Sequence, residues 1–384
     1  MVPYDKLLSG LVQNTQEWLS HYGGLWGIAA LTLGLLIGNW MGKRRARIKP
    51  EMKPAPNDAV SDPGATVREV EMETRIWDRL VDVKKIFRLP RPADRHMRVI
   101  SFCNLKGGVG KTTLTANIAA TLANRGKKVL LIDLDHQRSL TLLALTAKQL
   151  SDFRLADNAI HSLFNPDERC VDLLYQIFRQ VSGYEDRLRL VAAHSKLSAI
   201  EDQAMLNWLM TPGSPDVRFA LTGELVSSQL RDWPDYVLLD CPPRFTTASI
   251  NALVASDFIV APIIPDVVSS DAIPFFVQSL QTLAHLFPAD GLEKRLGLVA
   301  NRCRPAFTPE AGYWDKIILS CPTEWRARMI GFQSAISDRV SFSKAAENIA
   351  LLKRGFAIDE REHANVPIAS QFNALCDELE AVLR

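Results

Sequence analysis

Features that would identify a zinc protein, a disulfide-rich domain or a nucleic-acid-binding protein at once are scarce in this chain. Its six cysteines include no C-x-x-C pair, and none has histidines nearby at metal-ligand spacing. We therefore expect reduced thiols without a disulfide framework. Lysine and arginine total 45 against 43 for aspartate and glutamate, a net charge of +2. That near balance gives the whole chain no electrostatic signature of nucleic-acid binding.

Charge is also missing from one long stretch near the N-terminus. Residues 22–42 contain no charged side chain and are mostly apolar, and a membrane-spanning helix needs about 20 such residues. Trp26 and Trp40 lie near its two ends, where membrane interfaces favour tryptophan. The basic residues that follow at once are Lys43, Arg44, Arg45, Arg47 and Lys49. The positive-inside rule then places residues 1–21 outside the cell membrane and the remainder in the cytoplasm.

Two other interpretations of this stretch stay open. A cleaved signal peptide would carry its basic residues before the apolar run, where this chain has only Lys6. A buried core helix is the second alternative, against which the abrupt basic cluster argues. We expect a single-pass transmembrane helix in the inner (cytoplasmic) membrane. Gly34 and Gly38 have a spacing that lets two such helices pack closely, although glycine is common in membrane helices.

Two connecting segments follow. Residues 43–65 form a basic and proline-rich linker, which cannot bury a core and is typical of an extended tether. Residues 66–96 show a helical pattern of apolar residues between Val67 and Phe87. We expect this helical connector to dock on the main domain or on a partner.

Residues 97–384 alternate between strand and helix patterns. The expected strands are Arg98–Cys103, Lys128–Asp133, Arg187–Ala193, Tyr236–Asp240, Asp257–Ile263 and Leu296–Asn301. Helical patterns lie between most of them. Such alternation predicts an α/β fold with a mostly parallel sheet covered by helices on both faces.

A phosphate-binding loop is the decisive motif of this domain. The block consists of Lys106, Gly107, Gly108, Val109, Gly110, Lys111, Thr112 and Thr113. It follows the first expected strand and opens a helix over 113–124. Glycines free backbone N–H groups to wrap phosphate oxygens, and the helix N-terminus adds the positive end of its dipole. In such a P-loop, Lys111 reaches the β- and γ-phosphates and Thr112 offers its hydroxyl to Mg²⁺, so we expect ATP and Mg²⁺ as cofactors.

The loop departs from the general P-loop at two positions. Leu105 stands where the general pattern has glycine, and Lys106 is an additional lysine. With this second lysine the chain resembles the ParA/MinD family of deviant Walker A ATPases. The resemblance implies a homodimer on ATP in which Lys106 reaches the partner's nucleotide. A cation supplied in this way stabilises charge during phosphoryl transfer, as an arginine finger does.

Two further motifs follow in the family's order. Residues 129–135 resemble the Walker A′ strand, which implies that Asp133 lies near Mg²⁺ through water and that Asp135 positions the attacking water. Residues 236–243 resemble Walker B, which implies that Asp240 holds the water shell of the metal.

The resemblance includes the end of the strand at Asn301, but the loop after Asp135 departs from the family pattern. Asn301 and Arg302 match the strand end whose asparagine reads the adenine edge in the family. After Asp135 the ParA subgroup usually has Pro-Gln-Gly-Asn, and of these residues the segment 136–139 keeps only Gln137. How closely switching and hydrolysis follow the family is therefore open. Beyond about Ala306 no family role is assigned.

The function that these patterns favour is a membrane-anchored ATPase switch that recruits or positions an unknown protein partner. A DNA-partitioning ATPase is an alternative, in which nucleic acid binds the loosely basic C-terminal stretch; acidic residues are interspersed there, so it is not favoured. A capsule-export type tyrosine kinase would end in a tyrosine cluster, and no tyrosine follows Tyr313. An iron–sulfur ATPase would need a cysteine pair placed for a cluster.

Overall fold

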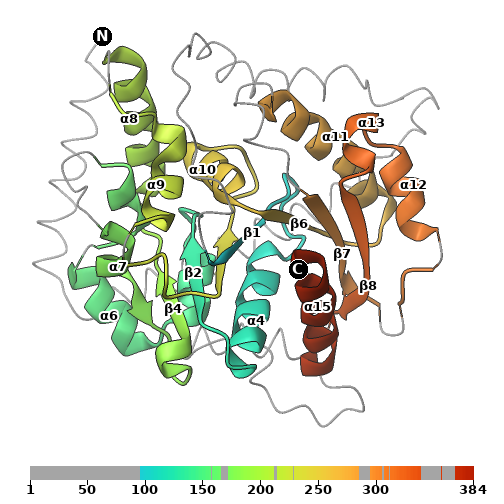
Figure 1. Cartoon of the computed structure of the whole chain (residues 1–384), viewed down its shortest axis with the longest axis horizontal. Coiled ribbons are helices and arrows are strands. Elements are labelled where there is room, and N and C mark those ends of the chain that lie inside the picture. Colours follow the sequence, from blue (N-terminus) through green and yellow to red (C-terminus); the bar gives the residue numbers. More distant parts are fainter. Residues whose placement is uncertain are drawn as a thin grey trace, which may run out of the picture. The chain divides into compact units, whose positions relative to one another are not determined.

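The structure is a computed structural model of the whole chain (Figure 1). It describes residues 96–156, 158–165, 172–211, 214–227, 229–284, 295–304, 307–310, 312–338, 356 and 368–384. The predicted N-terminal segment, transmembrane helix and linker lie outside these residues, as does the helical connector except for its last residue. Among the helices that the structure describes, none is both long and apolar enough to cross a membrane.

Eight strands of the described chain form one sheet, in the order β3-β4-β2-β5-β1-β6-β7-β8. The strands are β1 (Arg98–Phe102), β2 (Val129–Asp133), β3 (Arg179–Gln180), β4 (Leu188–Val191), β5 (Tyr236–Asp240), β6 (Phe258–Ile263), β7 (Arg295–Cys303) and β8 (Met329–Ser337). All neighbouring pairs are parallel except β3 and β4. The predicted mostly parallel sheet is confirmed.

The central strands bring three segments to one edge of the sheet. β1 lies between β5 and β6, and its last residue, Phe102, is in register with Asp240 of β5. Asp240 is in turn in register with Asp133 of β2. Because parallel strands end at the same edge, the loops after β1, β2 and β5 meet there. Open α/β sheets bind their ligands at such an edge.

Apolar side chains alternate between the two faces of the sheet. In β2, Leu130 and Ile132 belong to one hydrophobic core, whereas Val129 and Leu131 belong to a second. The first core includes residues of α8 (Leu197–Met210), α9 (Ala220–Leu225), α10 (Thr247–Ala255), α11 (Val267–Ala284), α12 (Tyr313–Leu319) and α13 (Thr323–Arg326). The second includes residues of α4 (Lys111–Asn124), α5 (Ser139–Ala144), α6 (Ala147–Ala156) and α15 (Ile368–Leu383). Helices on both faces were predicted, and α4 and α15 lie side by side on the face toward the viewer in Figure 1.

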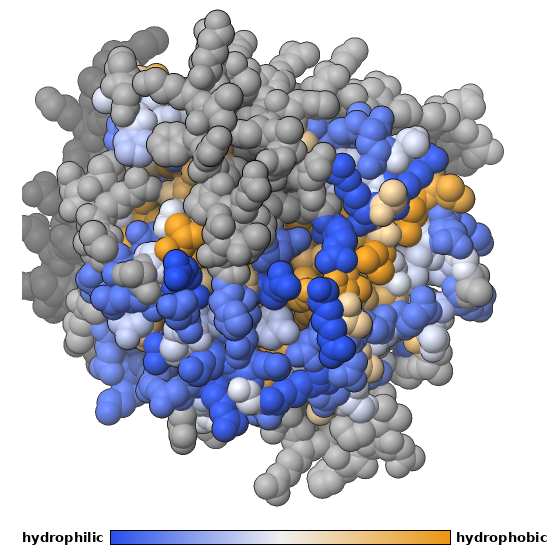
Figure 2. All heavy atoms as spheres, viewed as in Figure 1, coloured by the Kyte–Doolittle hydropathy of each residue, from blue (hydrophilic) through white to orange (hydrophobic). Residues whose placement is uncertain are grey.

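The remaining helical pieces are short. They are α7 (Leu173–Ile177) and the 3-10 turns at Ile160–Leu163, Glu185–Arg187 and Val217–Phe219. The face drawn in Figure 2 is mostly hydrophilic, with hydrophobic residues showing on the side of β8 and α12.

All six predicted strands are confirmed, and their ends differ from the prediction by two residues at most. The helix after the glycine-rich loop begins at Lys111, two residues before the predicted start, and ends at Asn124 as predicted. The sequence did not predict β3 or β8. β8 extends the sheet beyond β7, in parallel, with two register shifts.

Candidate functional site

The glycine-rich loop connects β1 to α4. Gly108 and Gly110 have φ angles of 75° and 86°, conformations that favour glycine. No side chain caps α4, whose N-cap residue is Gly110. A Cβ placed on Gly107 or Gly108 would have no heavy atom within 4 Å. The space beside these two glycines is therefore open and the N-terminus of α4 is uncapped, as in loops that bind phosphate.

Lys111 is held against this loop. It is the first residue of α4 and is only 7% exposed. Its Nζ donates a hydrogen bond of 3.3 Å to the carbonyl oxygen of Lys106. The ammonium group therefore lies next to the backbone that would surround the phosphates, where its predicted role requires it.

Two buried carboxylates stand side by side at the ends of β2 and β5. Asp133 and Asp240 are both 0% exposed. Burial raises the pKa of Asp133 to about 6. Burial, followed by the charge of Asp133, raises the pKa of Asp240 well above its ordinary value. The Thr112 hydroxyl and the Lys111 ammonium act in the opposite direction on the pKa of Asp240.

The donor set around Asp240 fits a hard cation. Both oxygens of Asp240 are buried, and neither has a hydrogen-bond partner that meets normal geometry. A buried carboxylate without partners is costly unless something else compensates its charge. The Thr112 hydroxyl lies close enough to affect it, and hydroxyl and carboxylate oxygens are the ligands that Mg²⁺ prefers. The described residues hold no cluster of three or more His, Cys, Asp or Glu side chains, and Mg²⁺ usually keeps several waters beside few protein ligands.

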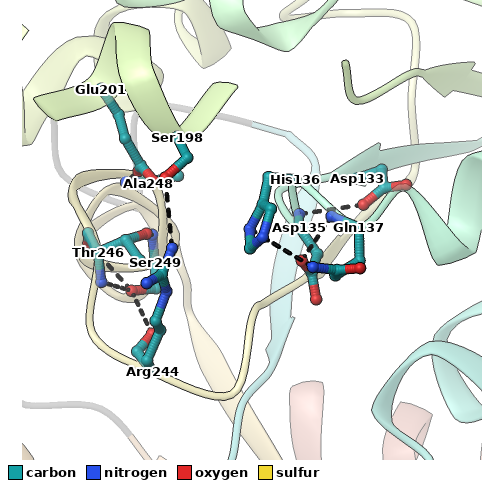
Figure 3. Close-up of polar contacts among 10 residues, drawn as sticks. All are labelled: Asp133, Asp135, His136, Gln137, Ser198, Glu201, Arg244, Thr246, Ala248 and Ser249. Carbon is teal, nitrogen blue, oxygen red and sulfur yellow. Dashed lines mark hydrogen bonds and ion pairs between the residues drawn. The ribbon is translucent and has the colours of Figure 1, made fainter. Parts of the chain in front are cut away.

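Asp135 lies in the loop that follows β2 (Figure 3). Its backbone N–H donates to Asp133 Oδ1 at 3.1 Å, and its Oδ1 accepts from the backbone N–H of Gln137 at 2.9 Å. His136 Nδ1 lies 3.5 Å from the same Oδ1. The Asp135 side chain is 14% exposed. It is thus fixed by its neighbours and still open to solvent on one side.

Lys106 lies at the start of the glycine-rich loop and pairs with an acidic residue from another element. Its Nζ is 3.7 Å from Asp266 Oδ1, in the loop between β6 and α11. Its backbone N–H donates to Asn104 Oδ1 at 3.0 Å, and Asn104 Nδ2 donates to the Pro262 carbonyl at 2.9 Å. The start of the loop is therefore linked to β6 through Asn104 and to the segment after β6 through Lys106.

Asn301 and Arg302 contact the glycine-rich loop itself. Asn301 Nδ2 donates to the Val109 carbonyl at 2.8 Å, and Arg302 Nη1 donates to the Gly108 carbonyl at 3.1 Å. A Cβ on Gly110 would lie 2.2 Å from Asn301 Nδ2. The end of β7 thus braces the loop, a contact that the sequence did not predict. The predicted role of Asn301 and Arg302 at the adenine stays a prediction.

Sequence reasoning missed two buried polar residues that link neighbouring elements. Thr141 of α5 donates two hydrogen bonds to Asp133, and nothing in its local sequence distinguishes it. Glu201 of α8 accepts from the backbone N–H of Ala248, in the first turn of α10, at 2.8 Å (Figure 3). Burial raises the pKa of Glu201 to about 7. The sequence did contain a signal for the burial of Glu201, because Leu197, Glu201 and Ala204 share one face of a helix.

Residues 97–289, just over half of the chain, match the AAA_31 family, which is described as an AAA domain. The chain belongs to this family. The match begins just before β1 and ends beyond α11, so it contains the glycine-rich loop and all three aspartates of the predicted site.

Several curated proteins are similar to this chain. An uncharacterized protein of Methanocaldococcus jannaschii is 31% identical over 208 residues, which are 54% of this chain and 73% of that protein. The sporulation initiation inhibitor protein Soj of Bacillus subtilis is 30% identical over 167 residues, 43% of this chain and 58% of its own length. The chromosome-partitioning ATPase Soj of Thermus thermophilus is 29% identical over 210 residues, 53% of this chain and 67% of its own. The predicted membership of the ParA family is supported, and the chain spans little more than half of the Bacillus protein.

Solved structures show the fold. A cobyrinic acid a,c-diamide synthase of Mycobacterium smegmatis, with a bound ATP analogue and magnesium, has a TM-score of 0.53 at 22% identity and covers 75% of this chain and 96% of its own. A putative plasmid partition protein of Borrelia burgdorferi bound to AMPPNP has a TM-score of 0.51 at 20% identity, with 74% and 99% covered. At such identities the likeness establishes an α/β P-loop fold, as predicted, and nothing narrower.

Proposed function

We propose that this chain is a membrane-anchored, Mg²⁺-dependent ATPase that dimerises on ATP and acts as a switch at the cytoplasmic face of the membrane. In the ATP state it recruits or positions a protein partner. The observation that carries the proposal is the meeting of the glycine-rich loop with the buried carboxylate of Asp240, which has no hydrogen bond of normal geometry, at one edge of the sheet. That edge offers a phosphate cradle beside a cation site.

The residues of this edge divide the work of binding. The amides of residues 107–113 and the Lys111 ammonium bind the phosphates. Thr112 and Asp240 would hold Mg²⁺ and its waters, with Asp133 near the metal through water. When bound, Mg²⁺ neutralises charge that develops on the phosphate oxygens. Asn301 and Arg302 hold the loop and face the adenine side.

Hydrolysis requires a positioned water and a further cation. Asp135 is the residue that we assign to the water, because its carboxylate is fixed by Gln137 and remains partly exposed. Lys106 supplies the cation to the nucleotide of a second copy in the dimer. In this arrangement Lys111 binds the nucleotide of its own chain, and Lys106 acts on the nucleotide of the other copy.

Anchoring rests on the sequence of residues 22–42 and on the basic residues that follow. An uncharged run of this length, preceded by Lys6 alone and followed by a cluster of basic residues, favours an ATPase domain in the cytoplasm. Full-length protein should sediment with membranes and resist extraction by high salt or alkali. Deleting residues 1–49 should release it, and full-length protein in the soluble fraction would contradict the anchor.

The ATPase proposal is tested on the full chain in detergent. Phosphate release from ATP is measured with Mg²⁺, and then with a chelator in its place. We expect turnover with Mg²⁺ and none without it. A chain that binds ATP and Mg²⁺ and releases no phosphate under any of these conditions would limit the proposal to nucleotide binding.

A DNA-partitioning ATPase is the second candidate, and the observation that favours it is the likeness to the chromosome-partitioning ATPase of Thermus thermophilus. Most of the C-terminal basic stretch lies outside the described residues, and Arg326 and Arg328 lie within them. Binding to a duplex of arbitrary sequence, strengthened by ATP and weakened by salt, would favour this candidate over the membrane switch.

A further inference from the structure

Thr141 is buried in the first turn of α5, and its backbone N–H and its hydroxyl both donate to one oxygen of Asp133. Its backbone N–H lies 2.8 Å from Asp133 Oδ2, and its hydroxyl lies 2.7 Å from the same oxygen. Thr141 is 1% exposed and Asp133 is 0% exposed. Two hydrogen bonds to one carboxylate oxygen, made without competing water, fix the orientation of the whole carboxylate group.

The same hydroxyl also accepts a hydrogen bond. The backbone N–H of Ala193, just after β4, donates to Thr141 Oγ1 at 2.9 Å. The hydroxyl proton is therefore donated to Asp133, because the Ala193 N–H is itself a donor and needs a lone pair of the hydroxyl oxygen. Thr141 thus ties the end of β2 to the start of the segment that leads from β4 into α8.

The second oxygen of Asp133 carries the constraint onward. Asp133 Oδ1 accepts from the backbone N–H of Asp135 at 3.1 Å. Rotation of the Asp133 carboxylate would break this bond, so the grip of Thr141 on Oδ2 also sets the backbone at Asp135. The side chain of Asp135 is in turn held by the Gln137 N–H.

We propose that Thr141 is a positioning residue for ATP hydrolysis, which fixes Asp133 and, through it, the carboxylate of Asp135. The proposal rests on the proposed ATPase function. Asp133 then has two roles: it lies near the metal, and it transmits the constraint from Thr141 to Asp135. Its three hydrogen bonds support the second role. The competing explanation is that Thr141 only stabilises the fold, by tying α5 to the end of β2 and to the segment after β4.

Kinetics of three variants separate these explanations in the full chain. Thr141→Val keeps the shape and removes both hydroxyl bonds, and Thr141→Ser restores the hydroxyl. Thr121→Val is the matched control, because Thr121 is also buried and its hydroxyl donates to the Asn117 carbonyl at 2.7 Å, about three turns of α4 away from the loop. Turnover, ATP affinity and melting temperature are measured for each variant.

Misplaced catalytic groups cost up to about 100-fold in rate, so we expect Thr141→Val to lower kcat by about 10- to 100-fold. Its ATP affinity should stay within about twofold of that of the unmutated chain. Thr141→Ser should recover most of the turnover, and Thr121→Val should lose melting temperature without losing kcat. If Thr141→Val does not fold, Thr141→Cys replaces it, because a thiol is similar in size and is a weak donor.

Three results would overturn the positioning role. The first is that Thr141→Val and Thr121→Val lose melting temperature to a similar extent and have equal turnover. A Thr141→Ser variant as slow as Thr141→Val is another. A loss of ATP affinity that accounts for the whole loss of turnover is the third. No turnover in the unmutated chain would overturn the ATPase function as well, so the two failures are distinguishable.

Discussion

Asp133 and Asp240 are register partners on neighbouring strands, and their carboxylates have opposite surroundings. Asp133 accepts three hydrogen bonds, from the N–H and hydroxyl of Thr141 and from the N–H of Asp135. Asp240 has none of normal geometry, although both of its oxygens are buried. Hydrogen bonds within the protein thus stabilise the Asp133 carboxylate, whereas the Asp240 carboxylate is available to a bound cation.

Removing the charge of Asp240 should therefore have two separate effects. Asp240→Asn should raise the Mg²⁺ concentration needed for half-maximal turnover, because the carboxylate that holds the water shell of the metal is lost. In the absence of ligand it should raise the melting temperature, because the folded state no longer buries a carboxylate beside the like charge of Asp133. Asp133→Asn is the matched variant, and it should lower the melting temperature by disrupting the bonds from Thr141. Equal thermal shifts in the two variants would contradict the distinction.

Lys111→Ala should abolish ATP binding. Lys111 is nearly buried against the loop, and its ammonium is the side-chain cation that the P-loop places at the β- and γ-phosphates. We expect a loss of affinity of about 100-fold or more in a direct titration with a fluorescent ATP analogue, since charge-assisted phosphate bonds are strong. Lys128→Ala is the control, because Lys128 is exposed and precedes β2 at the opposite edge of the sheet. Unchanged affinity in Lys111→Ala would remove this loop from the site.

Glu201 should make the stability of the protein depend on pH. Burial raises its pKa to about 7, with smaller opposing effects from the Ala248 N–H, Thr246 and Arg244. The folded state therefore binds the proton more tightly than the unfolded state does. The free energy of unfolding falls as pH rises from the unfolded pKa, near 4.5, to about 7. Glu201→Gln should remove this part of the pH dependence, which is on the order of 1–3 kcal/mol.

Urea unfolding at pH 5 and at pH 8 measures this effect. Glutamine keeps an oxygen for the Ala248 N–H, so Glu201→Gln should be more stable than the unmutated chain at pH 8 and similar to it at pH 5. Asp152→Asn, at an exposed position of α6, should leave the profile unchanged. Parallel profiles for the unmutated chain and Glu201→Gln would show that Glu201 stays ionised in the fold.

Local patterns explain which parts of this structure the sequence predicts. β2 and β5 were predicted because continuous apolar runs that end in aspartate are typical of strands buried on both faces. β8 was not, because buried, half-buried and exposed residues alternate irregularly along Met329–Ser337. Its Gly331 also belongs to a tertiary contact, since a Cβ there would lie 2.0 Å from Trp314 Cγ. The local sequence around Gly331 does not predict its contact with Trp314.

The same division holds at the site. The glycine-rich loop can be predicted because its eight residues are contiguous, and each has a role that its own chemistry explains. The brace by Asn301 cannot, because Asn301 and Val109 are 192 positions apart and only the sheet order brings them together. The pairing of Lys106 with Asp266 depends in the same way on β6 lying next to β1.

Asp266 should restrain Lys106 within its own chain. The pair is 3.7 Å apart, with Lys106 28% and Asp266 45% exposed, and exposed pairs contribute about 0.2–1 kcal/mol. Asp266→Asn should therefore strengthen ATP-dependent dimerisation by at most about fivefold. Sedimentation at several protein concentrations measures it, with Asp271→Asn, an exposed residue of α11, as the control. Weaker dimerisation in Asp266→Asn would mean that Asp266 supports the dimer and does not restrain Lys106.

Lys106→Ala and Asp135→Ala should fail at different steps. Asp135 orients water and does not touch phosphate, so Asp135→Ala should bind ATP, stop turning over and accumulate as an ATP-bound dimer. Lys106 acts on the nucleotide of the other copy, so Lys106→Ala should lose dimerisation and turnover together. Loss of such a transition-state cation costs on the order of 10³-fold or more in rate. Mass is measured by light scattering with ADP and then with ATP.

The predicted transmembrane helix complicates this measurement, because Gly34 and Gly38 could hold two chains together without nucleotide. The full chain is therefore placed in detergent at a large excess of micelles, and only the difference between its mass with ADP and its mass with ATP is interpreted. Asp135→Ala should show this difference even after long incubation, when the unmutated chain has hydrolysed its ATP. If Asp135→Ala shows no ATP-dependent gain in mass while Lys106→Ala dimerises normally, Lys106 is not a trans-acting residue. The chain would then hydrolyse ATP with Lys111 and Asp240 of one subunit alone, and the second lysine of the loop would only pair with Asp266.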